Sequence, residues 1–148
     1  MIALGKGGNT LKTHVSRIRT RYAETDQMGA IYNSHYLTYF EVGRTEYLRD
    51  AGFRYRDLEA RGVYLVVSEA HCKYRTPARY DEVLTVTTWV DRVRPTRIDF
   101  RHRLAREEDG TVIADGHLVL ACIGANRRPQ PLPDDVKQAI EVVEAPDA

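Results

Sequence analysis

The hydrophobic period of the chain changes near Val63, and this change constrains the fold more than any other feature of the sequence. Between Ser34 and Asp50, apolar or small residues recur at the spacing of one helix face; they are Tyr36, Phe40, Gly43 and Tyr47. From Val63 onward the period is two, as in strands that bury one face. One amphipathic helix followed by strands with short connections predicts an α+β domain in which the helix packs on an antiparallel sheet.

Turn-forming residues divide the alternating region into four expected strands. These cover residues 63–76, 82–91, 96–106 and 111–125, and a further strand is expected at 13–21, before the helix. Pro77 and Arg94-Pro95 end two of them, and Asp109-Gly110 is a strong hairpin signal. The sheet should therefore have about five strands. Residues 53–62 are consistent with a short helix or a turn-rich loop, and another short helix is expected near Pro133.

Gly43 stands in the middle of the predicted helix, where glycine costs about 1 kcal/mol relative to alanine. We expect that it allows the helix backbone to approach the sheet closely. In the strand at 96–106, alternation places one set of side chains on a single face, namely Ile98, Phe100, His102 and Leu104. We expect the apolar face of the helix and this face of the strand to form the core.

Composition excludes several classes of protein. At 148 residues the chain is long enough for one domain with a proper core. Its 22 Lys and Arg against 21 Asp and Glu leave a net charge of +1, which argues against a general nucleic-acid binder. The five histidines show neither HxxxH nor HExxH spacing, so the pattern predicts no metal site.

The cysteines and the N-terminus suggest a cellular compartment. Cys72 and Cys122 are far apart, and each lies in an apolar strand-like run, so we expect buried free thiols in a reducing cytoplasm. The chain has no apolar run long enough for a signal peptide or a membrane span. We expect a soluble cytoplasmic protein, with a flexible Gly-rich segment at 1–12 and a single domain at 13–148.

A carboxylate precedes the predicted helix closely in sequence. Asp26 and Gly29 occupy the first and fourth positions of a predicted type I turn, and Asn33 and Ser34 are candidate N-caps. On pattern alone, a structural turn residue is the favoured interpretation of Asp26. The alternative is a general base or nucleophile. Backbone N–H groups around Asn33 to His35 would then hold a developing oxyanion, at about 3 kcal/mol for each donor.

Two charged residues of the helix raise a further question. Arg44 falls inside the apolar arc of the helix, and a buried guanidinium needs a partner. We therefore expect an ion pair with Glu24, Glu41 or Glu69. Glu41 lies at the edge of the apolar arc, where an exposed carboxylate is the default and a role beside a substrate is the alternative.

These residues together form the pattern Asp26-x-x-Gly29-x-x-Tyr32-Asn33-x-x-Tyr36-x-x-x-Phe40-Glu41-x-x-Arg44-x-Glu46. The pattern resembles the acyl-CoA thioesterases of the 4-hydroxybenzoyl-CoA thioesterase family, which have the hot-dog fold. The resemblance covers about residues 13–125. It implies a long central helix wrapped by the antiparallel sheet, and a homodimer or homotetramer with active sites at the subunit interface.

The resemblance also implies roles for individual residues. Asp26 would be the catalytic nucleophile or general base, and the backbone N–H at Asn33 would polarise the thioester carbonyl. Gly29, Tyr32, His35 and Glu41 would contact the substrate. Many relatives have His or Tyr where this chain has Asn33, which matters little if the contribution there is the backbone amide. No cofactor, metal, nucleic acid or membrane is implied.

Three hypotheses about activity remain open at this stage. The first is hydrolysis of an acyl-CoA thioester to the free acid and CoA. The second is a non-catalytic module that binds an acyl or aromatic ligand. The third, dehydration of a hydroxyacyl thioester, usually uses a His/Glu pair, and the Asp at the motif position counts against it. The sequence leaves open the acyl group and the carrier, which is CoA or an acyl carrier protein.

Overall fold

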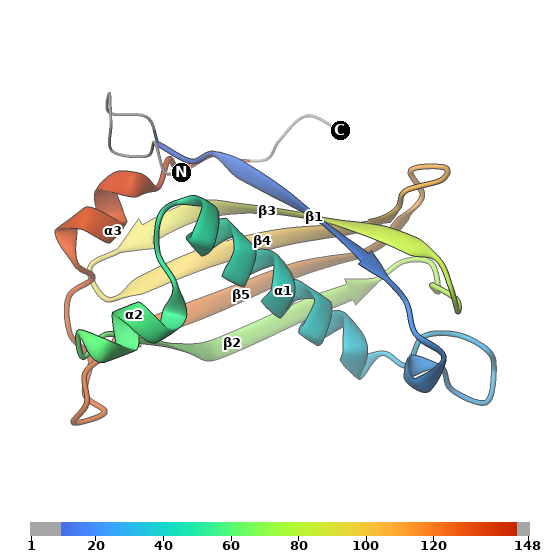
Figure 1. Ribbon diagram of the computed structural model, residues 1–148, viewed down its shortest axis with the longest axis horizontal. Helices are drawn as coiled ribbons and strands as arrows, with labels where there is room; N and C mark the ends of the chain where they lie inside the picture. Colours follow the sequence, from blue (N-terminus) through green and yellow to red (C-terminus); the bar gives the residue numbers. More distant parts are fainter. Residues whose placement is uncertain (1–9, 145–148) are drawn as a thin grey trace.

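Five strands form one antiparallel sheet in the computed structural model, which describes residues 10–144 (Figure 1). Their order across the sheet is β1-β3-β4-β5-β2, and every neighbouring pair is antiparallel. The strands are β1 (Thr13–Arg19), β2 (Tyr64–Tyr74), β3 (Val83–Arg94), β4 (Arg97–Arg106) and β5 (Val112–Ile123). The prediction of an α+β domain with about five antiparallel strands is confirmed.

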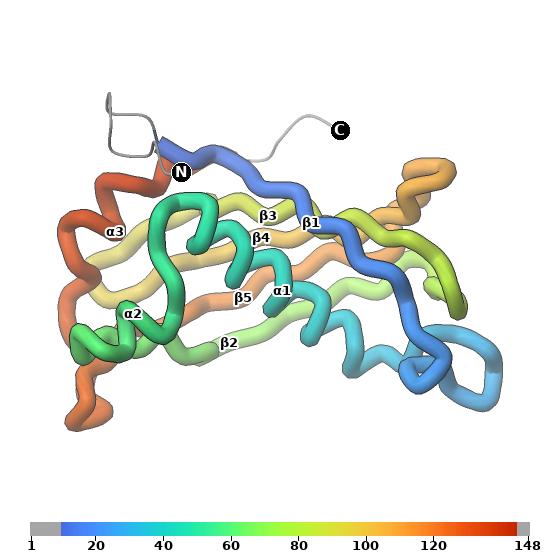
Figure 2. Tube along the Cα trace, in the orientation of Figure 1, coloured from blue at the N-terminus to red at the C-terminus, as the bar shows by residue number. Residues whose placement is uncertain are grey.

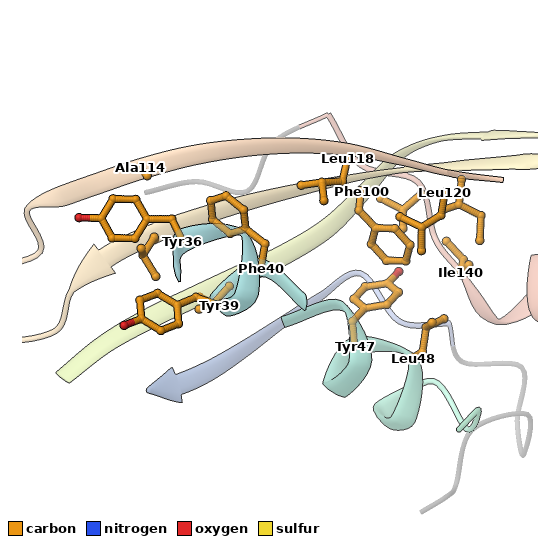
Figure 3. Packing of buried hydrophobic residues seen from close by; sticks show 14 of the residues in the cluster. Tyr36, Tyr39, Phe40, Tyr47, Leu48, Phe100, Ala114, Leu118, Leu120 and Ile140 are labelled. Carbon is orange, nitrogen blue, oxygen red and sulfur yellow. The ribbon is translucent and has the colours of Figure 1, made fainter. Parts of the chain in front are cut away.

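Helix α1 (Ser34–Asp50), of 17 residues, lies on one face of this sheet (Figure 1). Phe40 and Tyr47 point from the helix toward the sheet (Figure 3), where the Tyr47 ring meets Phe100 edge-on at a centroid distance of 5.6 Å. The predicted strand face is buried: Ile98, Phe100 and Leu104 are 0% exposed and His102 is 1% exposed. The predicted helix bounds and both halves of the predicted core are therefore confirmed.

Gly43 brings α1 close to β3, as expected. A Cβ atom at this position would lie 2.5 Å from Thr88 Oγ1 and 2.7 Å from Val86 Cγ1. Real Cβ atoms essentially never come so close to another heavy atom. Any side chain larger than hydrogen would thus displace Thr88 and Val86 or push the helix away from the sheet.

Strand β2 forms one edge of the sheet and runs along its lower border in Figure 2. Helix α1 packs mainly on β1 and β3, which lie toward the opposite edge of the sheet from β2. The residues of β2 that pair with the core-facing positions of β5 are Leu65, Val67, Ala70, Cys72 and Tyr74. Two of them stay largely exposed, Val67 at 47% and Tyr74 at 50%, so the helix side of β2 is apolar but poorly covered.

Several expected boundaries shift in the structure. β1 ends at Arg19 because a 3-10 turn, η1 (Tyr22–Glu24), follows it. β3 continues past Asp91 to Arg94, with a register shift between Val90 and Arg92. The uncertain region 53–62 contains α2 (Tyr55–Ala60), and the expected C-terminal helix is α3 (Asp134–Ala139).

The chain ends and the cysteines complete the fold. Residues 1–9 of the predicted flexible segment lie outside the described residues. Leu11, near its end, is tied down, because its N–H donates to the Ala139 carbonyl at 2.9 Å and its own carbonyl accepts from Tyr47 Oη at 3.1 Å. Cys72 and Cys122 are free thiols, as predicted; Cys122 is buried, whereas Cys72 is only half-buried. None of the helices between residues 10 and 144 combines the length and apolar character needed to cross a bilayer.

Candidate active site

The loop before α1 holds the Asp26 carboxylate in a fixed position. Gly29 N–H donates to the Asp26 carbonyl at 3.1 Å, which closes the predicted turn, and Gly29 has φ +78°. Asp26 Oδ1 accepts from the backbone N–H groups of Met28 at 2.9 Å and Ala30 at 3.2 Å. Within residues 10–144, Oδ2 meets no hydrogen-bond donor of the protein. One oxygen of the carboxylate thus stabilises the turn, while the other remains available for chemistry.

Glu24 supports this loop from inside the protein. It is 4% exposed, and its Oε1 accepts from Tyr39 Oη at 2.7 Å and from the Arg21 N–H at 2.8 Å. Burial raises the pKa of Glu24, but these hydrogen bonds outweigh it and hold the pKa below the ordinary value for glutamate. Its carbonyl accepts from the Tyr32 N–H at 2.9 Å. The loop is therefore anchored on both sides of Asp26.

The helix begins without the expected side-chain cap. Asn33 has helical dihedral angles, φ −59° and ψ −29°, and makes no side-chain capping bond. A capping side chain reaches back to the first turn from an extended backbone, so the helical angles of Asn33 prevent it from capping. Asn33 occupies the N-cap position, as predicted, but its side chain does not accept a hydrogen bond from any N–H group of the first turn.

The donors at this helix start are fewer than expected. The His35 N–H donates to the Tyr32 carbonyl at 3.0 Å, so this group is already occupied. Among the residues that the structure describes, the N–H groups of Asn33 and Ser34 meet no acceptor. The positive end of the helix dipole lies at the same place. An anionic or strongly polarised oxygen would be stabilised by Asn33 and Ser34, and not by His35.

A cleft of about 390 Å³ lies between this loop and the end of β2. Its lining residues are Asp26, Ile31, Asn33, Tyr36, Tyr74, Arg75, Thr76 and Pro77. Tyr36 is held in place because its Oη accepts from the buried Ala78 N–H at 3.0 Å. Burial raises the pKa of Tyr36, so this phenol stays neutral at physiological pH. Asp26, which carries the carboxylate, and Asn33, whose N–H is unpaired, thus line one cleft.

Comparison with known proteins identifies the relatives of the chain. Residues 20–140 match the sequence pattern of the Thioesterase-like superfamily. The chain belongs to this superfamily. The acyl-CoA thioester hydrolase YbgC of Escherichia coli is 30% identical over 80% of this chain and 89% of its own. The putative acyl-CoA thioesterase YneP of Bacillus subtilis is 46% identical over 53% of this chain, a match that spans 58% of YneP.

Solved structures of similar proteins share the fold. The hypothetical protein TT1821 of Thermus thermophilus has a TM-score of 0.80 at 39% identity, covering 85% of this chain and 95% of its own. The DHNA-CoA thioesterase of Staphylococcus aureus has a TM-score of 0.78 at 34% identity. The match covers 81% of this chain and 80% of the thioesterase chain. The expected kinship with thioesterases is confirmed.

The predicted site residues of the chain lie in three different places in the structure. Asp26 and Asn33 line the cleft together. Gly29 lies in the turn beside Arg79, while Tyr32, at 51% exposed, and His35 lie on the adjoining surface. None of these three lines the cleft. Glu41 lines a different cavity, further along α1.

Sequence reasoning missed the far wall of the cleft, which is formed by residues 74–77 at the end of β2. Tyr74 lies there with its ring 5.5 Å from that of Tyr36, and its Oη donates to the Asn33 carbonyl at 3.4 Å. No local signal marks these residues, because they follow the helix start by some forty positions. They reach the site only because β2 ends beside the N-terminus of α1 (Figure 1).

The second cavity, of about 350 Å³, contains Arg44 without the predicted ion pair. Arg44 is 6% exposed, and its Nε and Nη1 atoms are buried with no hydrogen-bond partner. Glu24 is bonded to Arg21 and Tyr39, and Glu69 lies on the opposite face of the sheet, 3.8 Å from His71. No carboxylate within residues 10–144 forms a salt bridge with Arg44. The ion-pair prediction is wrong: Glu24 and Glu69 have other partners, and Glu41, which lines the same cavity, is exposed and forms no salt bridge with Arg44.

One cluster on the outer face of the sheet has metal-ligand character. Ligand atoms of Asp91, Asp99 and His117 all lie within 4.8 Å of one another. However, Asp91 Oδ2 already pairs with Arg101 Nε at 2.7 Å, and Asp99 pairs with Arg94. These guanidinium groups neutralise both carboxylates, so the cluster is a salt-bridge network and does not support a metal site.

Proposed function

We propose that the protein hydrolyses an acyl-CoA thioester to the free acid and CoA in the cleft that contains Asp26 and Asn33. One observation carries the proposal: Asp26, a fixed carboxylate with a free oxygen, and Asn33, which has an unpaired N–H at the helix start, line the same cleft, and the unpaired N–H of Ser34 is next in the chain. The activity in the name of YbgC, a relative that this chain matches over most of its length, supports the same reaction.

The proposed chemistry divides the work between these groups. The thioester carbonyl oxygen accepts from the N–H groups of Asn33 and Ser34, which stabilise the negative charge that develops on it. Asp26 Oδ2 then either attacks the carbonyl carbon or removes a proton from the attacking water. The carbon–sulfur bond breaks, CoA leaves as the thiol, and water supplies the second oxygen of the acid. We assign substrate contacts near the cleft mouth to Gly29, Tyr32 and His35.

The decisive experiment measures CoA release from a panel of acyl-CoA thioesters. Asp26→Asn keeps the side-chain oxygen that accepts from Met28 and Ala30, but it removes the charge. We expect kcat to fall by about 10²- to 10⁴-fold. Asp109→Asn is a matched control, because Asp109 also accepts from the N–H two residues later, at 3.0 Å, but lies in an exposed hairpin.

The results separate the alternatives. Equal activity of wild type and Asp26→Asn would remove Asp26 from the mechanism. Tight binding of acyl-CoA without any turnover would instead favour a ligand-binding module. Single turnover in oxygen-18 water distinguishes the two roles of Asp26, since label enters the enzyme carboxylate only when Asp26 is the nucleophile.

We also propose that the active form is a homodimer or homotetramer assembled through β2. This edge strand exposes Val66 at 40%, Val67 at 47% and Tyr74 at 50%. A long edge strand with exposed apolar residues pairs readily with another chain. We assign the arrangement to the hot-dog fold and the protein to the cytoplasm, where its free thiols would stay reduced. Light scattering of wild type and Val67→Lys should give a larger mass for wild type, and a monomeric wild type would contradict the assembly.

A further inference from the structure

Arg44 is a buried cation whose charge nothing in the described chain neutralises. Its side chain lies at the wall of the 350 Å³ cavity, with two buried nitrogen atoms that lack an acceptor. A buried, unpaired charge costs several kcal/mol, so evolution retains one mainly where it has a use. The charge acts on its surroundings. The pKa of the buried His102 is lowered mainly by burial and also by the positive charge of Arg44. Glu41 also lines the cavity, but it is exposed and forms no salt bridge with Arg44, so the cavity presents a buried positive group without an ion-pair partner among the described residues.

The same two elements, α1 and β2, contribute to the lining of this cavity and of the proposed active site. Asn33 and Tyr36 of α1 meet Tyr74 of β2 at the first cleft, and Arg44 of α1 meets Val67 of β2 at the second cavity. Between the two, the helix side of β2 is apolar and poorly covered, because α1 packs mainly on β1 and β3. An apolar chain that enters at the first cleft can lie along this surface toward Arg44.

The spacing along α1 suits an acyl chain of medium length. Asn33 and Arg44 are eleven positions apart, which is about 16 Å along the helix axis at 1.5 Å per residue. Side chains of a helix lean toward its N-terminus, so the Arg44 guanidinium lies nearer to Asn33 than its Cα does. The distance from the carbonyl site to the guanidinium is thus comparable to an extended medium-chain acyl group.

We propose that Arg44 binds a carboxylate at the far end of the acyl group, so that the enzyme prefers ω-carboxyacyl thioesters to methyl-ended ones. A carboxylate supplies the acceptors that the guanidinium lacks, and charge-assisted hydrogen bonds between these groups are strong. Glu41 lies at the same cavity but is exposed and forms no ion pair with Arg44. It would compete weakly with the ligand. The inference rests on the proposed function, whose reaction it narrows to one substrate class.

The test compares two thioesters of equal chain length, sebacyl-CoA and decanoyl-CoA. Wild type should prefer sebacyl-CoA. Arg44→Met should lower kcat/KM for sebacyl-CoA by at least about tenfold and leave decanoyl-CoA nearly unchanged. Arg44→Lys should keep part of the preference, and Glu41→Gln should lower KM for sebacyl-CoA. Without ligand, Arg44→Met should melt no lower than wild type, because it removes an unpaired buried charge.

A measurement without turnover separates this inference from the proposed function. Free sebacate should raise the melting temperature of wild type, and this rise should be smaller or absent in Arg44→Met. If neither thioester is hydrolysed but the sebacate shift depends on Arg44, the proposed function fails and the carboxylate site stands. If the sebacyl-to-decanoyl ratio is the same in wild type and Arg44→Met, the inference is overturned. The inference is also overturned if the oligomer dissociates in Arg44→Met while the sebacyl-to-decanoyl activity ratio stays unchanged. In that case the anion that pairs with Arg44 would belong to a second copy of the chain.

Discussion

The contact between α1 and the sheet at Gly43 makes a quantitative prediction about stability. In Gly43→Ala the new Cβ would lie 2.5 Å from Thr88 Oγ1, 2.7 Å from Val86 Cγ1 and 3.3 Å from His102 Nδ1. These three side chains cannot move outward easily, because Thr88 and Val86 are 0% exposed and His102 is 1% exposed. Either they must shift within a packed core or the helix must move away from the sheet.

One gain and two losses determine the size of the effect. Alanine is a better helix former than glycine by about 1 kcal/mol. Against this, overpacking of a core costs about 1–3 kcal/mol. Displacement of Thr88 also weakens its 2.9 Å hydrogen bond to His102 Nδ1, a loss of about 1 kcal/mol. The free energy of unfolding should therefore fall by about 1–3 kcal/mol, although the substitution favours the helix itself.

Urea denaturation followed by circular dichroism measures this difference. Thr38→Ala is the control, because Thr38 lies on the same helix at an exposed position. It should change the free energy of unfolding by less than about 0.5 kcal/mol, or increase it slightly. A Gly43→Ala variant as stable as wild type, or more stable, would refute the argument that the helix backbone touches the sheet at this point.

Three further predictions concern buried polar groups. Burial and the nearby Arg44 hold the pKa of His102 well below its ordinary value. Below about pH 6.5 the folded state therefore binds fewer protons than the unfolded state. The free energy of unfolding should fall as the pH is lowered from about 7 to about 5. The slope, at most about 1.4 kcal/mol per pH unit for one proton, should be smaller in His102→Asn when both proteins are denatured with urea at each pH. Glu24→Gln weakens the acceptor of the Tyr39 hydroxyl, and should lower the free energy of unfolding by about 1–3 kcal/mol; an unchanged urea midpoint would contradict the anchoring role of Glu24. Tyr36→Phe leaves the buried Ala78 N–H without its acceptor, so it should cost about 1–3 kcal/mol and lower CoA release, and an unaffected variant would show that this phenol does not shape the cleft.

Local and periodic features of this protein could be predicted from its sequence. The bounds of α1, the number of strands, the buried face of β4 and the close approach at Gly43 all follow from hydrophobic spacing and the steric properties of glycine. The turn at Asp26 could also be predicted, because its hydrogen bonds join residues at most four positions apart.

Relations between distant segments needed the tertiary structure. The sequence placed a carboxylate near a helix start, but the cleft that joins them also requires Tyr74, some forty residues later, whose position depends on where β2 ends. Asn33 was expected to cap the helix, and its backbone angles, set by the preceding loop, prevent this. Arg44 was expected to find a glutamate, and the strand alternation that turns Glu69 to the opposite face of the sheet leaves it unpaired. Hydrophobic periodicity specifies which face of each element is buried, because that choice is local; which polar groups meet depends on how the elements are stacked, and this only the folded chain decides.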